Sequence, residues 1–555
     1  MIRQLLLLIP IALFLISCGG GGGGELSGDQ RKIFRYNQTG GLTSLDPAFA
    51  NKRSNIWAIT QLYNGLFNFT ENLDVHPELV KEWEISDDGR EYIFTIRHDV
   101  KFHDDPCFPD GIGREVRADD FVYSFRRLMN TGTGAWIFND KVLLGPDGNP
   151  SDTCFVKLDD YRFKIYLNRR FPAFLQILAM PYCFVLPQEA IDKYGDEYRA
   201  HPVGTGPFKM REWDEKTSLL LVKNDKYWKK DTRGNSLPYL DAIRVSFIED
   251  RNQEFRTFEN GDFEFIANLS ETSRDEILEK NGKVKENFSS KFNVEKVDYL
   301  NTEYVGFYLE GPQNKNPFVN KKLRQALSYA IDRKRLLSFT RNSLGTPGDY
   351  GVVPVALPSF DSTKVKGYSY NQRKALELLE EAGYPNGQGL PEIKLYTYTS
   401  DREIAEILQK EWSNIGVKVQ VELNQFSAHQ ELVDNGKVTL FRGSWLGDYP
   451  DAENYLAMFS STNFAPTGPN KTHFSDEEFD KLFEEAHETD NLFTRYEDYL
   501  KMDRIVMEAA PIIVLYYDEV LQLKQPYVVG LKADAMNNLR LETVDLNQGE
   551  EGVEN

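Results

Sequence analysis

The stretch from Glu392 to Leu423, EIKLYTYTSDREIAEILQKEWSNIGVKVQVEL, decides the fold class. Its two ends, 393–396 and 417–423, are rich in β-prone residues, and the segment between them carries apolar residues at helical spacing. Asp401 is placed to cap this helix, and Gly416 is placed to end it. A strand, a helix and a second strand of this length imply two parallel strands joined by a right-handed crossover. We therefore predict an α/β fold.

The rest of the chain also shows apolar residues at helical spacing and alternation typical of strands. Helices are expected to begin at Asn320, Asp332 and Asn371, each of which can cap the apolar stripe that follows it. At 555 residues the chain is too long for one core, so two to four structural units are expected. Alternation of apolar and polar residues predicts strands at 33–36, 91–97, 161–167, 219–223 and 242–248, and a further helix begins near 118.

The amino terminus has the features of an export signal. Arg3 precedes an apolar run over 5–16, which is too short to span a bilayer as a mature helix but has the length of a signal peptide. Residues 15–18, LISC, resemble a lipobox, and a glycine tether follows. We predict that 1–17 are removed, that Cys18 carries a lipid, and that 18–30 tether an exported protein in the periplasm or at the cell surface. The alternative is an ordinary secretory signal with an incidental Cys.

The formal net charge of −20 restricts the partners. Proteins that bind nucleic acids concentrate Lys and Arg to displace counterions, so no nucleic-acid role is indicated. An anionic membrane surface would also repel this chain, and membrane attachment therefore needs a covalent or inserted anchor.

Three cysteines remain after Cys18, and an odd number cannot all pair within the chain. Cys107 and Cys154 lie in polar, loop-rich surroundings, whereas Cys183 lies in an apolar run. An exported protein can form disulfides, so we predict one between Cys107 and Cys154. Their spacing does not suit a zinc site, and His98 and His103 lie in a strand-end context, so no metal is expected.

A second stretch, VTLFRGSWLGDYPD at 438–451, has the composition of a binding segment. Gly residues in a strand allow another backbone to approach, Trp445 can form a rigid wall, and Arg442 and Asp448 supply opposite charges. An extended zwitterion would suit such a segment. The alternative is that Arg442 pairs with Asp448 and that Trp445 belongs to the core.

Short motifs along nearly the whole mature chain are similar to those of one family. They are LDP at 45–47, YNGL at 63–66, PELV at 77–80, ADDF at 118–121, GTGPF at 204–208, AIDR at 330–333 and EAGYP at 381–385. In this order they resemble the extracytoplasmic solute-binding proteins of peptide ABC transporters, the oligopeptide- and dipeptide-binding proteins. The resemblance implies a two-lobed flytrap fold with a discontinuous first lobe, closing over a ligand at a hinge.

The family's boundaries, carried onto this chain, divide it as follows. Lobe one comprises 31–65, 204–298 and 522–555, the last with an acidic tail; the accessory domain comprises 66–203; lobe two comprises 299–521.

The resemblance also implies roles within the second stretch. Arg442, Trp445 and Asp448 match a pattern on the strand that pairs with bound peptide in oligopeptide-binding members. Asp448 would hold the ligand amine and Arg442 its carboxylate, while Ser444 and Leu446 would pair with its main chain. An extended strand separates the Cα atoms of Arg442 and Asp448 by up to about 20 Å, and the side chains leave roughly 10 Å, which suits tripeptides, tetrapeptides or slightly longer ligands.

The sequence thus predicts a lipid-anchored monomeric receptor that delivers short peptides to an ABC permease driven by separate ATPase subunits. No cofactor or catalysis is expected, since Gly-x-Ser-x-Gly, His-Glu-x-x-His and phosphate-loop patterns do not occur. Two alternatives remain open. The same fold could bind an oligosaccharide, a metal chelate or haem. An exported peptidase or scaffold protein is the other.

Overall fold

The structure is a computed structural model that describes residues 31–547, apart from 132, 133, 135, 140 and 268. Cys18, the signal segment, the tether and the acidic tail from 548 onward lie outside these residues. In the described ranges, no helix combines the length and apolarity needed to cross a membrane.

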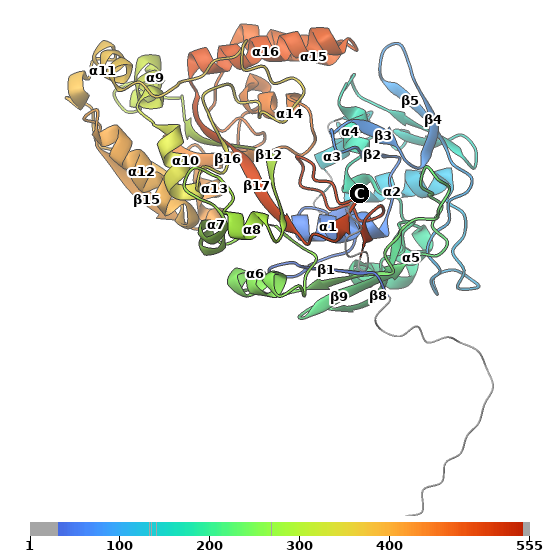
Figure 1. Cartoon of the computed structure of the whole chain (residues 1–555). Coiled ribbons are helices and arrows are strands. Elements are labelled where there is room, and N and C mark those ends of the chain that lie inside the picture. The colour runs from blue at the N-terminus through green and yellow to red at the C-terminus, as the bar shows by residue number, and fades with distance from the viewer. Residues whose placement is uncertain (1–30, 132–133, 135, 140, 268, 548–555) are drawn as a thin grey trace, which may run out of the picture.

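One eleven-stranded sheet connects the two lobes, as Figure 1 shows. Its order is β15 (Val419–Asn424), β14 (Ile393–Tyr398), β16 (Leu440–Leu446), β12 (Asn293–Phe307), β17 (Ile512–Lys524), β11 (Phe265–Ala267), β1 (Ile33–Asn37), β10 (Ala242–Ser246), β9 (Ser218–Lys223) and β8 (Phe208–Asp214), with β13 (Thr346–Pro347) paired to β17.

The stretch that decided the fold class forms the outer part of this sheet. β14 and β15 are parallel, with Ile393 opposite Val419, and α12 (Arg402–Ser413) connects them. The predicted α/β class is therefore confirmed. The predicted capping role of Asp401 is wrong, because its carboxylate makes no cap hydrogen bond and instead binds Arg442.

Two long strands, β12 and β17, carry the chain between the lobes. Asn293 to Asp298 of β12 pair with β17 in one register, and the pairing resumes at Thr302 after a shift. The amino-terminal half of β12 therefore lies beside β17 near lobe one, and its carboxyl-terminal half also pairs with β16 in lobe two. Register shifts bend strands, and a second one lies between Glu303 and Tyr304, so the ladder is irregular over residues 299–304.

Helices cover both faces of the lobe-two sheet. Successive residues of a strand point to opposite faces, and Leu440 packs into one apolar cluster while Phe441 packs into another. One face carries α9 (Lys321–Tyr329), α10 (Arg333–Arg341), α11 (Gln372–Glu381) and α12, and the other α14 (Glu453–Leu456), α15 (Glu477–Glu488) and α16 (Leu492–Ala509). α13 (Phe426–Asp434) packs near β14.

Lobe one and the accessory domain share a continuous apolar core that runs from Phe34 to Leu546. The accessory domain contains a four-stranded sheet of β4 (Val80–Ile85), β5 (Glu91–Ile96), β7 (Arg162–Tyr166) and β6 (Phe155–Lys157), and the hairpin β2 (Phe67–Phe69) and β3 (Val75–Pro77). Its helices are α2 (Ala118–Asn130), α3 (Trp136–Asn139), α4 (Phe174–Leu178) and α5 (Gln188–Tyr194). Lobe one contributes α1 (Arg53–Leu62), α6 (Arg251–Glu259), α7 (Glu271–Ile277), α8 (Glu286–Ser289) and the short pair β18 (Val528–Val529) and β19 (Asp545–Leu546).

The three described cysteines are free thiols, so the predicted Cys107–Cys154 disulfide is wrong. Cys154 is only 1% exposed and belongs to the apolar core. Cys107 lies in a turn, where its backbone N–H donates to the Asp105 carboxylate at 2.7 Å. Polar neighbours in the sequence did not reveal that the fold turns Cys154 inward.

Candidate functional site

β16 has an open edge beyond Phe441, on the side opposite β12. β16 pairs with β12 along its length, with Gly443 opposite Tyr304 and Leu446 opposite Asn301. On the other side, β14 meets β16 at Phe441 alone. Beyond this point no strand in the described part of the chain pairs with that edge.

The backbone of Ser444 and Leu446 points to this open edge. Gly447 N–H donates to Leu300 C=O at 2.8 Å, which continues the ladder to β12. Hydrogen-bonded and non-bonded pairs alternate in an antiparallel ladder, so the N–H and C=O groups of 444 and 446 point away from β12. The Arg442 carbonyl points the same way, and it accepts a hydrogen bond from His429 Nε2 at 2.8 Å. Ser444 and Leu446 are exposed and free to pair with an extended chain.

Arg442 is committed to partners inside the protein. Its side chain is 1% exposed, and its Nη2 atom lies 2.7 Å from Glu303 and 3.0 Å from Asp401. Its Nη1 atom donates to the Tyr304 carbonyl at 2.6 Å. The alternative in which Arg442 pairs with Asp448 is therefore wrong. A ligand carboxylate could reach this guanidinium only by displacing Glu303 or Asp401, so the structure gives no support to the predicted carboxylate contact.

Asp448 follows the open edge and keeps its carboxylate without an ionic partner among the described residues. Asn454 Nδ2 donates to this carboxylate at 3.3 Å, and Asp448 N–H donates to Asn454 Oδ1 at 3.2 Å. Burial raises the pKa of Asp448, more than the Asn454 hydrogen bond and the positive charge of Lys141 lower it. A partly buried carboxylate that forms no salt bridge is a suitable site for a ligand ammonium.

The side chain of Trp445 lies against the core of lobe two. It is partly buried against the lobe-two cluster that contains Tyr455, and its Nε1 atom donates to Asn454 at 2.9 Å. This is largely the core role that the sequence left open. Because Asn454 holds both Trp445 and Asp448, it links the packing of the core to the position of the carboxylate.

The accessory domain closes against lobe two beside Asp448. Phe171 is buried between Tyr449 and His487, with ring centroids 6.2 Å and 5.7 Å away. Arg169 pairs with Glu484 at 3.1 Å, and the adjacent Arg170 pairs with Asp490. These contacts cover one end of the site.

Lobe one supplies a polar cavity that the sequence reasoning missed. It has a volume of about 50 Å³ and is lined by Asn37, Gln38, Thr39, Arg53, Trp57, Arg251, Glu254, Phe265, Ile266 and Ala267. These residues come from the carboxyl ends of β1 and β11 and from α1 and α6. Ligands of α/β sheets bind at the carboxyl ends of parallel strands, so the polar residues that follow the first strand were the available signal.

Glu254 is the acid of this cavity, and only 4% of it is exposed. Burial raises the pKa of Glu254 to about 7, while side-chain hydrogen bonds from Asn37 and Thr39 and the charges of Arg251 and Arg53 act in the opposite direction. Burial therefore favours the protonated form of this acid.

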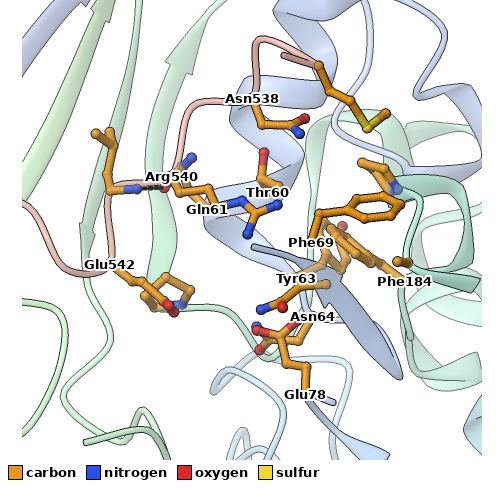
Figure 2. A pocket seen from close by; sticks show the side chains of 16 residues that line it. Thr60, Gln61, Tyr63, Asn64, Phe69, Glu78, Phe184, Asn538, Arg540 and Glu542 are labelled. Carbon is orange, nitrogen blue, oxygen red and sulfur yellow. Dashed lines mark hydrogen bonds between the residues drawn. The ribbon is translucent and has the colours of Figure 1, made fainter. Parts of the chain in front are cut away.

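A second cavity of about 50 Å³ is lined by residues of α1, of the accessory domain and of the segment 536–542, as Figure 2 shows. Its polar groups are mostly satisfied by one another. Asn64 donates to Glu78 at 3.0 Å and accepts from Thr205 at 2.9 Å, and Glu542 pairs with Lys229 at 2.6 Å. This network joins lobe one to the accessory domain.

Glu254 generates a prediction about stability. The folded state binds its proton more tightly than the unfolded chain, so the free energy of unfolding falls as pH rises from about 4.5 through about 7. The difference corresponds to about 3 kcal/mol above pH 7. Glu254→Gln should remove this loss, which urea unfolding at pH 5 and pH 8 will measure.

The matched control is Glu271→Gln, on the exposed side of α7, which should follow the wild-type pH dependence. Equal pH dependence in Glu254→Gln and the wild type would contradict the assignment of Glu254 as a buried acid.

Known proteins share this architecture and sequence. The chain is 30% identical over 497 residues to heme-binding protein A of Haemophilus influenzae, covering 85% of this chain and 84% of that protein. It is 26% identical over 538 residues to dipeptide-binding protein DppE of Bacillus subtilis, covering 93% and 92%. The solved structure of HbpA2 from Haemophilus parasuis matches with a TM-score of 0.79 and 25% identity, covering 93% of this chain and 99% of that one. Residues 74–466 match the family described as bacterial extracellular solute-binding proteins, family 5 Middle. Since this match covers most of the chain, the protein belongs to the family-5 bacterial extracellular solute-binding proteins.

Proposed function

We propose that this protein is a lipid-anchored receptor that captures short peptides between its lobes and delivers them to an ABC permease. One observation carries the proposal: the open edge of β16 leads directly to the partly buried carboxylate of Asp448, which forms no salt bridge with a described residue. A peptide is the ligand that offers both a strand backbone and a terminal ammonium.

Strand addition explains how such a site accepts many peptides. The N–H and C=O groups of Ser444 and Leu446 pair with the ligand main chain, which every peptide shares. The side chains of Ser444 and Leu446 are exposed, so we expect them to discriminate little between ligand side chains. The expected ligands are tripeptides, tetrapeptides or slightly longer peptides.

The relatives favour two ligand classes, since one is named for heme and another for dipeptides. The open strand edge favours a peptide, because a porphyrin has no backbone amides to pair with it. Mass spectrometry of small molecules released from freshly purified protein tests this directly. Peptides support the proposal, and a released porphyrin with Soret absorption overturns it.

The transport role requires membrane attachment and partner subunits. The negatively charged chain would be held at the membrane by a lipid on Cys18, as a monomer, with the glycine tether giving it reach toward the permease and its ATPase subunits. Binding and delivery need neither a cofactor nor catalysis.

Cys18→Ser should release the protein from the membrane, because it removes the lipid and an anionic membrane surface repels a chain of this net charge. Fractionation and intact mass measure the outcome. A mutant that stays membrane-bound with an unchanged processed mass would contradict the anchor.

Asp448→Asn should weaken binding of a free-amine peptide by on the order of 2 to 5 kcal/mol, because it removes one partner of a desolvated charge pair. N-acetylation of the peptide should weaken binding to the wild type by a similar amount. The two losses should not add, since both remove the same interaction. Calorimetry on this four-member cycle gives the answer.

Glu431→Gln, an exposed change on α13, serves as the control and should bind like the wild type. Additive losses, or the absence of a loss, would show that Asp448 does not hold the amine.

A further inference from the structure

An aromatic pair, Tyr398 and Phe426, lies at the Arg442 end of the open edge of β16, away from Asp448. Tyr398 is the last residue of β14, and its ring stacks on that of Phe426, the first residue of α13, with centroids 5.3 Å apart and planes at 21°. Phe426 is 67% exposed. Covering this apolar surface is favourable, so the pair is a place where a ligand side chain can bind.

Direct contacts join this pair to β16. The Tyr398 ring lies edge-on to the ring of His429, with centroids 4.4 Å apart. His429 Nε2 in turn donates to the Arg442 carbonyl at 2.8 Å, and Figure 1 shows α13 beside β16. Gln430 Nε2 donates to the Tyr398 hydroxyl at 3.1 Å and holds the ring in place. α13 therefore occupies the edge of β16 at Arg442, and the aromatic pair lies where the open part of the edge begins.

The order of the sheet shows where a bound strand would meet the pair. β14 lies next to β16 and meets it at one position, with Tyr396 opposite Phe441. The two strands are parallel, so Tyr398 lies two positions further along, just before the level of Ser444. β14 ends at Tyr398. A peptide strand on the open edge therefore occupies the line that β14 would follow beyond Tyr398, and its nearest residue abuts the aromatic pair.

The position of the pair selects one residue of the ligand. The proposed ammonium site is Asp448, so a bound peptide runs antiparallel to β16, from Asp448 toward Arg442. Opposed residues of such a ladder advance together by about 3.4 Å each. With its first residue opposite Leu446, beside Asp448, the peptide has its third residue opposite Ser444. The third residue is thus the one next to the aromatic pair.

We infer that Tyr398 and Phe426 form a subsite for a large apolar or aromatic side chain on the third residue of the ligand. The inference rests on the proposed function and adds a preference to it, because main-chain pairing alone reads every peptide alike. The face of Phe426 suits an aromatic ring, which gains both burial and ring stacking. The preference belongs to the third residue and not to the first, since the pair lies at the end of the edge away from Asp448.

The experiment measures calorimetric affinities of the tetrapeptides Ala-Ala-Xaa-Ala, in which Xaa is Ala, Leu, Phe or Lys, and of Phe-Ala-Ala-Ala. The wild type should bind the Leu and Phe peptides about tenfold more tightly than tetraalanine. Phe426→Ala should lose about tenfold for Ala-Ala-Phe-Ala and little for tetraalanine or Phe-Ala-Ala-Ala. Phe426→Trp keeps an aromatic ring at this position and should retain the preference.

Phe339→Ala is the matched control, because Phe339 is 61% exposed on α10 and does not belong to the aromatic pair. This variant should bind every peptide like the wild type. Because the side chain of Phe426 is mostly exposed, its truncation leaves the core of lobe two intact.

The outcomes separate the two claims. If the wild type binds the peptides and discriminates against their N-acetyl forms, but Xaa makes no difference, the proposed function stands and the subsite is overturned. Equal losses for Ala-Ala-Phe-Ala and tetraalanine in Phe426→Ala also overturn it, as does a preference for Lys over Phe. If none of the peptides binds, the proposed function fails and the inference fails with it. The comparison of peptides on the wild type does not depend on any variant folding.

Discussion

The pairing of β12 with β17 is the constraint on which the rest of the structure depends. The two strands run through both lobes, and their backbone hydrogen bonds continue on each side of the register shift at 299–301. Unpaired buried backbone groups are costly, so bending is expected at the register shifts and not within the regular ladder on either side. β16 attaches to one half of β12, and β11 attaches to β17 at the other end. β16 and β11 therefore lie on different sides of the shift at 299–301.

Buried charge is balanced differently at Arg442 and at Asp448. In lobe two, Arg442 is balanced by Glu303 and Asp401, which together form a closed structural network. Asp448 forms no such salt bridge among the described residues, and its carboxylate accepts a hydrogen bond from Asn454. Removing a single charge from water without a partner is expensive, whereas a paired charge is tolerated.

The accessory domain contacts both lobes. It shares a core with lobe one, and the polar network around Glu78 and Asn64 joins them. It also reaches lobe two through Phe171 and the neighbouring arginines. The accessory domain is therefore packed into the core of lobe one and also contacts lobe two.

The sequence by itself determined the local elements and the class of fold. Periodicity within 392–423 predicted the parallel pair β14 and β15, and Asn320, Asp332 and Asn371 do cap the helices that follow them. These features depend on neighbours a few residues apart, which a single sequence displays.

Only the tertiary structure decided the partners of the charged and polar side chains. Arg442 binds Asp401 and Glu303, which are 41 and 139 residues away, and Asp401 consequently gives up its expected cap. Cys154 is turned into the core, and Gln38, Arg53 and Glu254 meet around one cavity. Each of these contacts joins segments that the fold brings together over long separations. Local spacing carries no information about which distant group completes an ion pair or a cavity wall, and that choice is made by packing and by the cost of burying charge.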